Sequence, residues 1–130
     1  MVCLDTDVII DFLKKDKEIY KKIAELKEEQ VELSTTTINA FELFRGNRKL
    51  SEESKEDSVD IFLNNVRVHK FALEDSKKAA EIFEQLKSRG EIIELTDVMI
   101  ASVAIMNNES LLTRNKKHFE RIDQLKLEKV

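Results

Sequence analysis

Four residues that could bind a metal ion or transfer protons lie far apart in the sequence, each next to an expected helix or strand: Asp5, Glu42, Asp97 and Asn115. Asp5 directly follows the apolar run Val2–Leu4. A strand this apolar is expected inside a parallel sheet, so Asp5 would lie at the sheet's carboxyl edge, where open α/β folds hold their ligands. The sequence therefore predicts an acidic site at that edge.

Each of these residues, taken alone, also has a purely structural explanation. Asp5, Asp97 and Asn115 stand at the start of expected helices, where Asp and Asn cap free backbone N–H groups. Glu42 could form an ion pair with Arg45, three residues further along the same helix. A functional site is favoured only by the four positions taken together.

The expected helix geometry turns two of the carboxylates inward. With 3.6 residues per turn, Glu42 projects beside Ile38 and Phe41, and Asp97 begins the apolar stripe that contains Ile100. An unpaired charge in the core or in a crevice is costly, and no Lys or Arg stands beside Asp97 in the sequence. These carboxylates therefore need a compensating partner.

A divalent cation would supply that compensation. Three carboxylates within about 4–5 Å repel each other by about 4 kcal/mol per pair at an effective dielectric constant near 20. A set of oxygen ligands without Cys or His favours Mg²⁺ or Mn²⁺ over Zn²⁺. Such an ion activates water and binds phosphate oxygens during phosphodiester cleavage. We expect Asp5, Glu42 and Asp97 to be its ligands.

Apolar runs alternate with helical periods along the chain, which predicts an α/β fold: a three-layer α/β/α sandwich with a central, mostly parallel sheet, in one domain over residues 1–130. The expected strands are Val2–Asp5, Val31–Ser34, Val66–His69, Ser110–Thr113 and Leu125–Glu128. The expected helices are Thr6–Lys15, Lys17–Glu29, Thr36–Arg45, Glu52–Asn64, Glu74–Arg89, Asp97–Asn107 and Lys116–Ile122. Gly46 and Gly90 are the expected glycine stops.

The composition indicates a globular protein of the cytoplasm. Of the 130 residues, 42% are hydrophobic and 37% charged, and the net charge is −4. The single cysteine, Cys3, excludes a disulfide framework within the chain and favours a reducing compartment. No signal peptide is visible, and the longest apolar run, Val98–Met106, is far shorter than the roughly 20 residues of a membrane span.

Four segments, in order, resemble the motifs of PIN-domain nucleases, in particular the small VapC-type toxins. These segments are residues 4–11 (LDTDVIID), 41–46 (FELFRG), 96–101 (TDVMIA) and 112–119 (LTRNKKHF). The resemblance extends along essentially the whole chain. It implies a Mg²⁺- or Mn²⁺-dependent endoribonuclease that leaves a 3′-hydroxyl and a 5′-phosphate.

The resemblance also assigns residues. It implies that Asp5, Glu42 and Asp97 form the acidic site, with Asn115 where many relatives carry a fourth Asp and Thr113 as the hydroxyl residue of the last motif. Two positions depart from the family pattern. Asp7 replaces a common Asn and adds a charge, whereas Asn115 removes one, which leaves fewer ligands for a second metal ion.

The resemblance further implies an RNA substrate, an antitoxin partner of the VapB type and a homodimer. A basic rim for RNA phosphates would comprise Arg45, Arg48, Lys49, Arg114, Lys116 and Lys117. The apolar stripes of Lys17–Glu29 and Ser51–Val66 could form a groove for an antitoxin helix, or be covered by the protein's own core. We assign no catalytic role to His69 or His118.

Two alternatives remain open from the sequence. Asp5 and Asp7 fit the Asp-x-Asp motif of haloacid dehalogenase-type phosphatases, but the later acidic motifs of that class are missing from this sequence. The chain could instead be a PIN-like module that binds RNA or protein without cleaving it.

Overall fold

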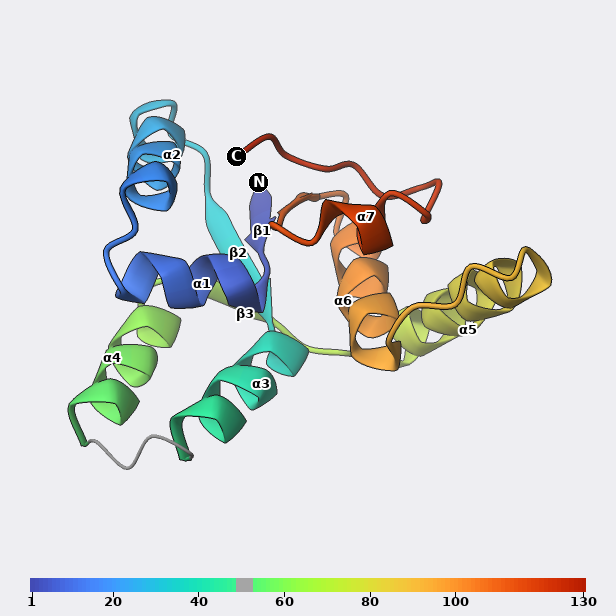
Figure 1. The fold of residues 1–130 in the computed structure, drawn as a ribbon, viewed down its shortest axis with the longest axis horizontal. Coiled ribbons are helices and arrows are strands. Elements are labelled where there is room, and N and C mark those ends of the chain that lie inside the picture. Colours follow the sequence, from blue (N-terminus) through green and yellow to red (C-terminus); the bar gives the residue numbers. More distant parts are fainter. Residues whose placement is uncertain (49–52) are drawn as a thin grey trace.

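Four short strands and the helices between them make up the structure, a computed structural model that describes residues 1–48 and 53–130, and the side chains outside 47–57 (Figure 1). The strands are β1 (Val2–Leu4), β2 (Leu33–Thr36), β3 (Arg67–His69) and β4 (Ser110–Leu112). The helices are α1 (Thr6–Leu13), α2 (Lys17–Glu28), α3 (Thr37–Arg48), α4 (Glu53–Asn64), α5 (Leu73–Ser88), α6 (Leu95–Met106) and α7 (Lys116–Phe119).

The strands form one parallel sheet in the order β3-β2-β1-β4. The chain builds the sheet outward from β1 through β2 to β3, and then returns to place β4 on the other side of β1. The strand order therefore reverses between β1 and β4. In open α/β sheets, the carboxyl ends at such a reversal flank the ligand-binding crevice. The expected parallel sheet is confirmed.

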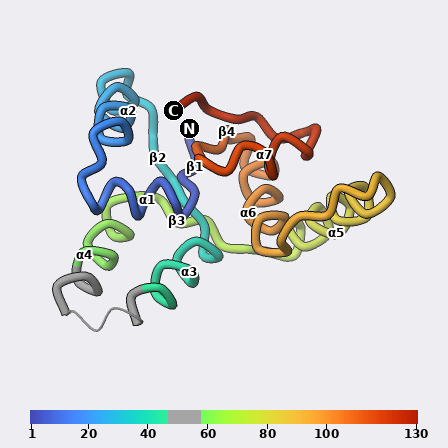
Figure 2. The backbone as a smooth tube through the Cα atoms, viewed as in Figure 1, coloured from blue at the N-terminus to red at the C-terminus, as the bar shows by residue number. Residues whose placement is uncertain are grey.

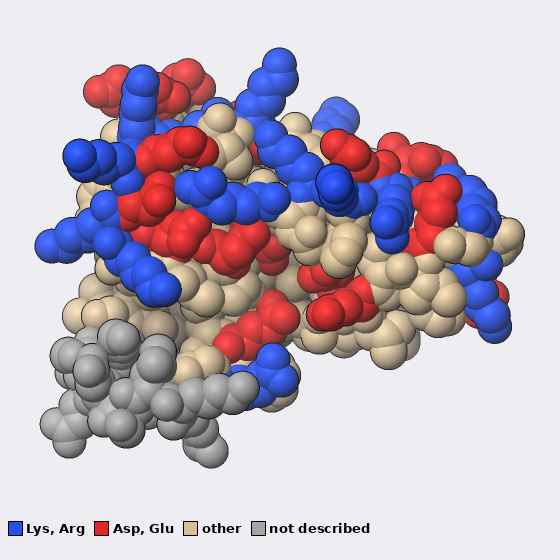
Figure 3. All heavy atoms as spheres, viewed as in Figure 1, with Lys and Arg blue, Asp and Glu red and all other residues tan. Residues whose placement is uncertain are grey.

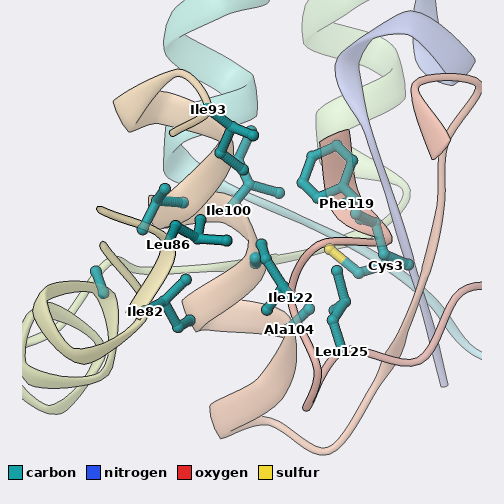
Figure 4. Packing of buried hydrophobic residues seen from close by; sticks show 13 residues of the cluster. Cys3, Ile82, Leu86, Ile93, Ile100, Ala104, Phe119, Ile122 and Leu125 are labelled. Carbon is teal, nitrogen blue, oxygen red and sulfur yellow. The ribbon is translucent and has the colours of Figure 1, made fainter. Parts of the chain in front are cut away.

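Two apolar cores cover the two faces of the sheet, because neighbouring residues of a strand point to opposite sides. Cys3 and Leu111 point into a core shared with α5, α6 and α7, which Figure 4 shows around Leu86 and Phe119. Val2, Leu4 and Leu112 point into a second core, which is completed by α1, α2 and α4 together with Leu43 of α3. In Figure 1 the two groups of helices lie on opposite sides of the strands, which confirms the three-layer sandwich.

Several helices follow the sequence pattern closely. The buried side of α2 is Ile19, Ile23 and Leu26, as its i, i+4, i+7 spacing predicts. Helix α6 is buried on most sides, and α5 gives way to Gly90, whose φ of 68° is the left-handed conformation expected at this stop.

Other boundaries differ from the expectation. Helix α3 does not stop at Gly46 but continues to Arg48, and Phe41, expected near the core, is 58% exposed. Strand β2 begins two residues later than expected, at Leu33. The start of the expected helix at Glu52 lies outside the described residues.

The expected last strand, Leu125–Glu128, is reduced to one isolated parallel bridge between Leu127 and Leu111. Figure 2 shows this final stretch of chain running back past β4. It packs through Leu125 and Leu127 against the first core, so its apolar residues are used for packing rather than for a ladder of hydrogen bonds.

A polar cluster is buried beneath the same face of the sheet. Glu109, 4% exposed, accepts a hydrogen bond from Ser34 Oγ at 2.6 Å and contacts His69 Nε2. These contacts link β2, the end of β3 and the turn before β4. The contact of His69 therefore serves the packing of the sheet. Among the described residues, no helix is long and apolar enough to cross a membrane.

The two ends of α5 provide a test of the packing. Leu86 is 1% exposed in the first core, whereas Leu73 on the same helix is 70% exposed. We expect Leu86→Ala to lower the free energy of unfolding by about 2–5 kcal/mol, because it leaves a cavity. The same change at Leu73 should cost less than about 0.5 kcal/mol. Urea unfolding followed by circular dichroism measures both, and equal losses would contradict this packing.

Candidate active site

The candidate site lies where the strand order reverses. Asp5 follows β1 and Thr113 follows β4, and the two strands are neighbours in the sheet. The backbone N–H of Asp5 donates to the carbonyl of Leu112 at 3.0 Å, which continues the strand pairing to the start of both loops. The parallel sheet therefore brings together two residues that are separated by more than one hundred positions.

The carboxylate of Asp5 is buried, at 6% exposure, and accepts hydrogen bonds on both oxygens. Oδ1 accepts from the backbone N–H of Thr6 at 2.8 Å and from Asn39 Nδ2 at 3.2 Å. Oδ2 accepts from Thr113 Oγ1 at 2.7 Å. All of these donors are neutral, so they orient the carboxylate without supplying a compensating positive charge.

Burial, together with the negative charges of Asp7 and Asp97, raises the pKa of Asp5 to about 7. The hydrogen bonds from Thr113 and Thr6 act in the opposite direction, because they stabilise the ionised form. A carboxylate with this balance favours either a proton or a cation at neutral pH. Perturbed groups of this kind are typical of functional sites.

Glu42 and Asp97 face the same region. Glu42, on α3 and partly buried, accepts a hydrogen bond from Thr6 Oγ1 at 2.7 Å. Asp97, in the first turn of α6, has a side chain only 14% exposed. Burial raises the pKa of Asp97, His118 lowers it, and the charges of Glu94 and Glu42 raise it. Asp97 therefore interacts electrostatically with both Asp5 and Glu42.

On the face shown in Figure 3, acidic side chains over α1, α3 and α6 gather around a hollow. Among the described residues, however, no group of three or more His, Cys, Asp and Glu side chains is arranged so that it could already hold a metal ion. Glu42 is bonded to Thr6, and Asp5 is bonded to three donors. The donor chemistry suits a hard cation, because neighbouring negative charges raise the pKa of Asp5 and of Asp97, but the oxygens of Asp5 and Glu42 are held by neighbouring protein groups.

Asn115 lies beside this cluster rather than within its carboxylate contacts. Its backbone N–H donates to Thr113 Oγ1 at 3.0 Å, and its side-chain nitrogen lies 2.9 Å from His118 Nδ1. His118 Nδ1 in turn lies 3.6 Å from Asp97 Oδ2. Asn115 is thus connected to Asp5 through Thr113 and to Asp97 through His118, for which no catalytic role was predicted.

Asp7 has a capping environment. Its Oδ1 accepts from the backbone N–H of Val8 at 2.7 Å, and its Oδ2 accepts from that of Arg114 at 3.1 Å. Burial raises the pKa of Asp7, whereas these two backbone hydrogen bonds lower it. The side chain therefore joins the start of α1 to the loop that follows β4.

The basic rim differs from the expectation at Arg114. Its guanidinium pairs with Asp11 at 2.7 Å, Asp16 at 3.1 Å and Glu18 at 3.4 Å, so acidic side chains already surround its charge. The rim's other members include Lys117 and Arg45, which are exposed. The Arg48 side chain and Lys49 lie outside the described residues.

The sequence did not single out Asn39, which is fully buried and bonded to Asp5. One signal was available: Asn39 stands three residues before Glu42 on the same helix, so both side chains project from the same face of α3. His118 had a similar signal, since it lies three residues after Asn115.

Comparisons with known proteins agree on one family. The family model described as PIN domain matches residues 2–125. Ribonuclease VapC1 of Methanocaldococcus jannaschii is 35% identical over 126 residues, covering 97% of this chain and 84% of that protein. Ribonuclease VapC2 of Rickettsia felis is 31% identical, covering 96% of this chain and 94% of that protein.

Solved structures agree. A chain in the crystal structure of VapBC2 from Rickettsia felis, bound to a DNA fragment from their promoter, superposes with a TM-score of 0.90 at 30% identity, covering 98% of each chain. A chain of VapBC-1 from nontypeable Haemophilus influenzae gives 0.86 at 28% identity, covering 98% of this chain and 97% of the other. The expected family resemblance is thereby confirmed in sequence and in structure, and this protein belongs to the PIN domain family.

Proposed function

We propose that this protein is an endoribonuclease that requires Mg²⁺ or Mn²⁺ and acts as the toxin of a VapBC-like toxin–antitoxin pair. The observation that carries this is the buried Asp5 carboxylate, which lies at the strand-order reversal, is oriented by neutral donors and interacts electrostatically with Asp97. The relatives named Ribonuclease VapC support RNA as the substrate. Residues 1–130 would form one catalytic domain that works in the cytoplasm.

Nucleases of this family generally depend on divalent metal ions. In this chain, Asp5 and Asp97 would be the principal ligands, and Glu42 would join them directly or through water. A bound ion would lower the pKa of a water molecule and withdraw charge from phosphate oxygens. Water would attack the phosphorus and the bond to the 3′ oxygen would break, which leaves a 3′-hydroxyl and a 5′-phosphate.

The surrounding residues have distinct tasks in this proposal. Thr113 holds Asp5 Oδ2 through its hydroxyl, so the carboxylate cannot rotate freely. Glu42 would orient the attacking water or accept its proton, once its hydrogen bond to Thr6 is exchanged for that water. Asn115 would act through Thr113 and His118. Arg45, Lys116 and Lys117 would bind RNA phosphates.

Neither alternative from the sequence is favoured. Asp7 accepts backbone N–H groups on both oxygens, so it is used as a cap rather than offered as the general acid of a phosphatase, and the chain belongs to a different family. The non-catalytic alternative predicts that the carboxylates can be replaced without loss of function. Our proposal predicts that replacing them abolishes RNA cleavage.

We expect Asp5→Asn and Asp97→Asn to reduce the rate of RNA cleavage at least about 100-fold, because each removes a charged metal ligand. EDTA should abolish cleavage by the wild-type protein, and added Mn²⁺ should restore it. Cleavage of labelled RNA on gels measures the rates. Asp123→Asn, at a carboxylate 74% exposed and paired with Arg89, is the matched control and should retain full activity. Full activity in either site variant would contradict the proposal.

The raised pKa of Asp5 predicts a pH effect on stability in metal-free protein. Between about pH 4 and 7 the folded state keeps a proton that the unfolded state has lost, so the free energy of unfolding falls as pH rises through this window. Asp5→Asn carries no charge and should lack this fall. We expect the variant to gain on the order of 2–4 kcal/mol over wild type between pH 5 and pH 8. Urea unfolding in EDTA tests this, and parallel pH profiles would contradict it.

We also propose where the antitoxin binds. A groove with a volume of about 520 Å³ lies between α1, α2 and α4. Phe12 stacks on Tyr20 with ring centroids 4.6 Å apart and lies 5.6 Å from Phe62, while Ile61 beside them is 63% exposed. Part of the expected segment, Ser51 and Glu52, lies outside the described residues. The relatives solved as VapBC complexes support an antitoxin partner, and an apolar helix face would suit this groove.

Ile61→Glu should prevent capture of a VapB-type antitoxin, because it places a charge in the apolar groove without touching the candidate site. RNA cleavage by this variant should equal that of wild type and should no longer be inhibited by the antitoxin. Co-purification measures capture. Met106→Glu, which makes the same change at a side chain 44% exposed at the end of α6, is the control. Normal capture by Ile61→Glu would show that the groove is not the docking site.

The proposed homodimer would cover apolar side chains that a monomer leaves in water. Phe41 and Phe44 on α3, 58% and 41% exposed, are suited to such a contact. Sedimentation velocity of the purified chain distinguishes the two states.

A further inference from the structure

Asn39 connects α3, the helix that carries Glu42, to Asp5 and Thr6 at the start of α1. It lies in the first turn of α3, is fully buried, and uses every hydrogen-bonding atom of its amide. Its Oδ1 accepts from the backbone N–H of Thr36 at 3.3 Å and from Thr36 Oγ1 at 2.7 Å. Because a backbone N–H can only donate, the oxygen must face Thr36, and the NH₂ group must face α1.

The two hydrogens of this NH₂ group have two acceptors. One is Asp5 Oδ1 at 3.2 Å and the other is Thr6 Oγ1 at 2.9 Å. Since the Thr6 hydroxyl accepts from Asn39, its own hydrogen is available for Glu42 Oε1, 2.7 Å away. A single buried amide therefore contacts Asp5 directly and fixes the direction of the hydroxyl that holds Glu42.

The chemical type of residue 39 matters for a cation site. A Lys or Arg here would neutralise Asp5 with a salt bridge and compete with a metal ion for it. An Asp or Glu would add another buried negative charge. An apolar residue would leave Thr36 N–H and the Thr6 hydroxyl with fewer partners. An amide orients both carboxylates and leaves their negative charge uncompensated, which suits the capture of a cation.

We propose that Asn39 is a positioning residue, which sets the orientation of Asp5 directly, and of Glu42 through Thr6, for binding a divalent cation. This inference rests on the proposed function in one respect, namely that the site takes such an ion. It adds to the machinery of the site Asn39, which lies outside the four motif segments, and Thr6, which lies in the first segment but was assigned no role there.

The test measures Mn²⁺ binding to the purified protein by the electron paramagnetic resonance signal of free Mn²⁺, without RNA. Asn39→Leu keeps the number and branching of the side chain's heavy atoms and removes the amide. We expect its Kd for Mn²⁺ to rise about 10- to 100-fold, the effect usual for a group that orients a metal ligand. Asn107→Leu makes the same change at an exposed amide bonded to Val103 O, and its Kd should stay within twofold of wild type.

Thr6 provides a second, milder test. Thr6→Val keeps the shape and removes the hydroxyl that joins Asn39 to Glu42, so the Kd for Mn²⁺ should again rise, by less than in Asn39→Leu. Thr6→Ser restores the hydroxyl and should restore the Kd. A merely structural role would lower the amount of folded protein and hence the number of sites, but would leave the Kd of the folded fraction unchanged.

The outcomes separate this inference from the proposed function. An unchanged Kd in folded Asn39→Leu would overturn the inference, and so would an unchanged Kd in Thr6→Val if Asn39→Leu fails to fold. A wild-type protein that binds no Mn²⁺ at millimolar concentration would also overturn it. A wild-type protein that binds Mn²⁺ with the expected variant effects but cleaves no RNA would overturn only the proposed function.

Discussion

The buried carboxylate of Asp5 is the constraint on which the rest of the candidate site depends. Its oxygens are satisfied by a backbone N–H, a hydroxyl and an amide, which together come from α1, α3 and the loop after β4. None of these donors carries a charge. The fold therefore orients the carboxylate but buries it without a compensating positive charge. Burial and the nearby negative charges raise its pKa to about 7. A site built in this way would be stabilised by the binding of a cation.

The topology explains why these elements meet at Asp5. Because β4 returns to the opposite side of β1 from β2, the loop after β4 lies on one side of Asp5 and the start of α3 on the other. Thr113 and Asn39, separated by 74 positions, can then donate to the two oxygens of the same carboxylate. The reversal of strand order thus supplies both a crevice and the donors on its two sides.

Much of this could be predicted from the sequence, and the remainder has physical reasons. The strand before Asp5, the buried stripe of α2 and the stop at Gly90 depend on local pattern, so they were predicted. The length of α3 was not predicted correctly. A glycine inside a helix costs only about 1 kcal/mol, so the presence of Gly46 does not by itself decide whether the helix stops or continues. The family motif indicated Thr113 as a site residue, and the strand order brings its hydroxyl to Asp5.

The role of Asn39 could not be inferred from the sequence, because it depends on a contact between two helices. A lone Asn in a helix beside apolar residues reads as an ordinary polar residue until its neighbour across the fold is known. The same holds for Arg114, whose charge looked available for RNA. In the fold it faces Asp11, Asp16 and Glu18, acids that come from α1 and the start of α2.

These pairings also bear on how an acidic protein could bind RNA. The hollow is surrounded by acidic side chains, which would repel a phosphate that approached the site without a cation. The engagement of Arg114 with three acids reduces the negative charge of the neighbouring surface but contributes little free positive charge. Under the proposed function, attraction near the scissile bond would then come chiefly from the metal ion, with exposed side chains such as Lys117 acting further out. Under the proposed function, metal binding and productive RNA binding would therefore be coupled, because the same uncompensated carboxylates that attract the ion would repel the substrate in its absence.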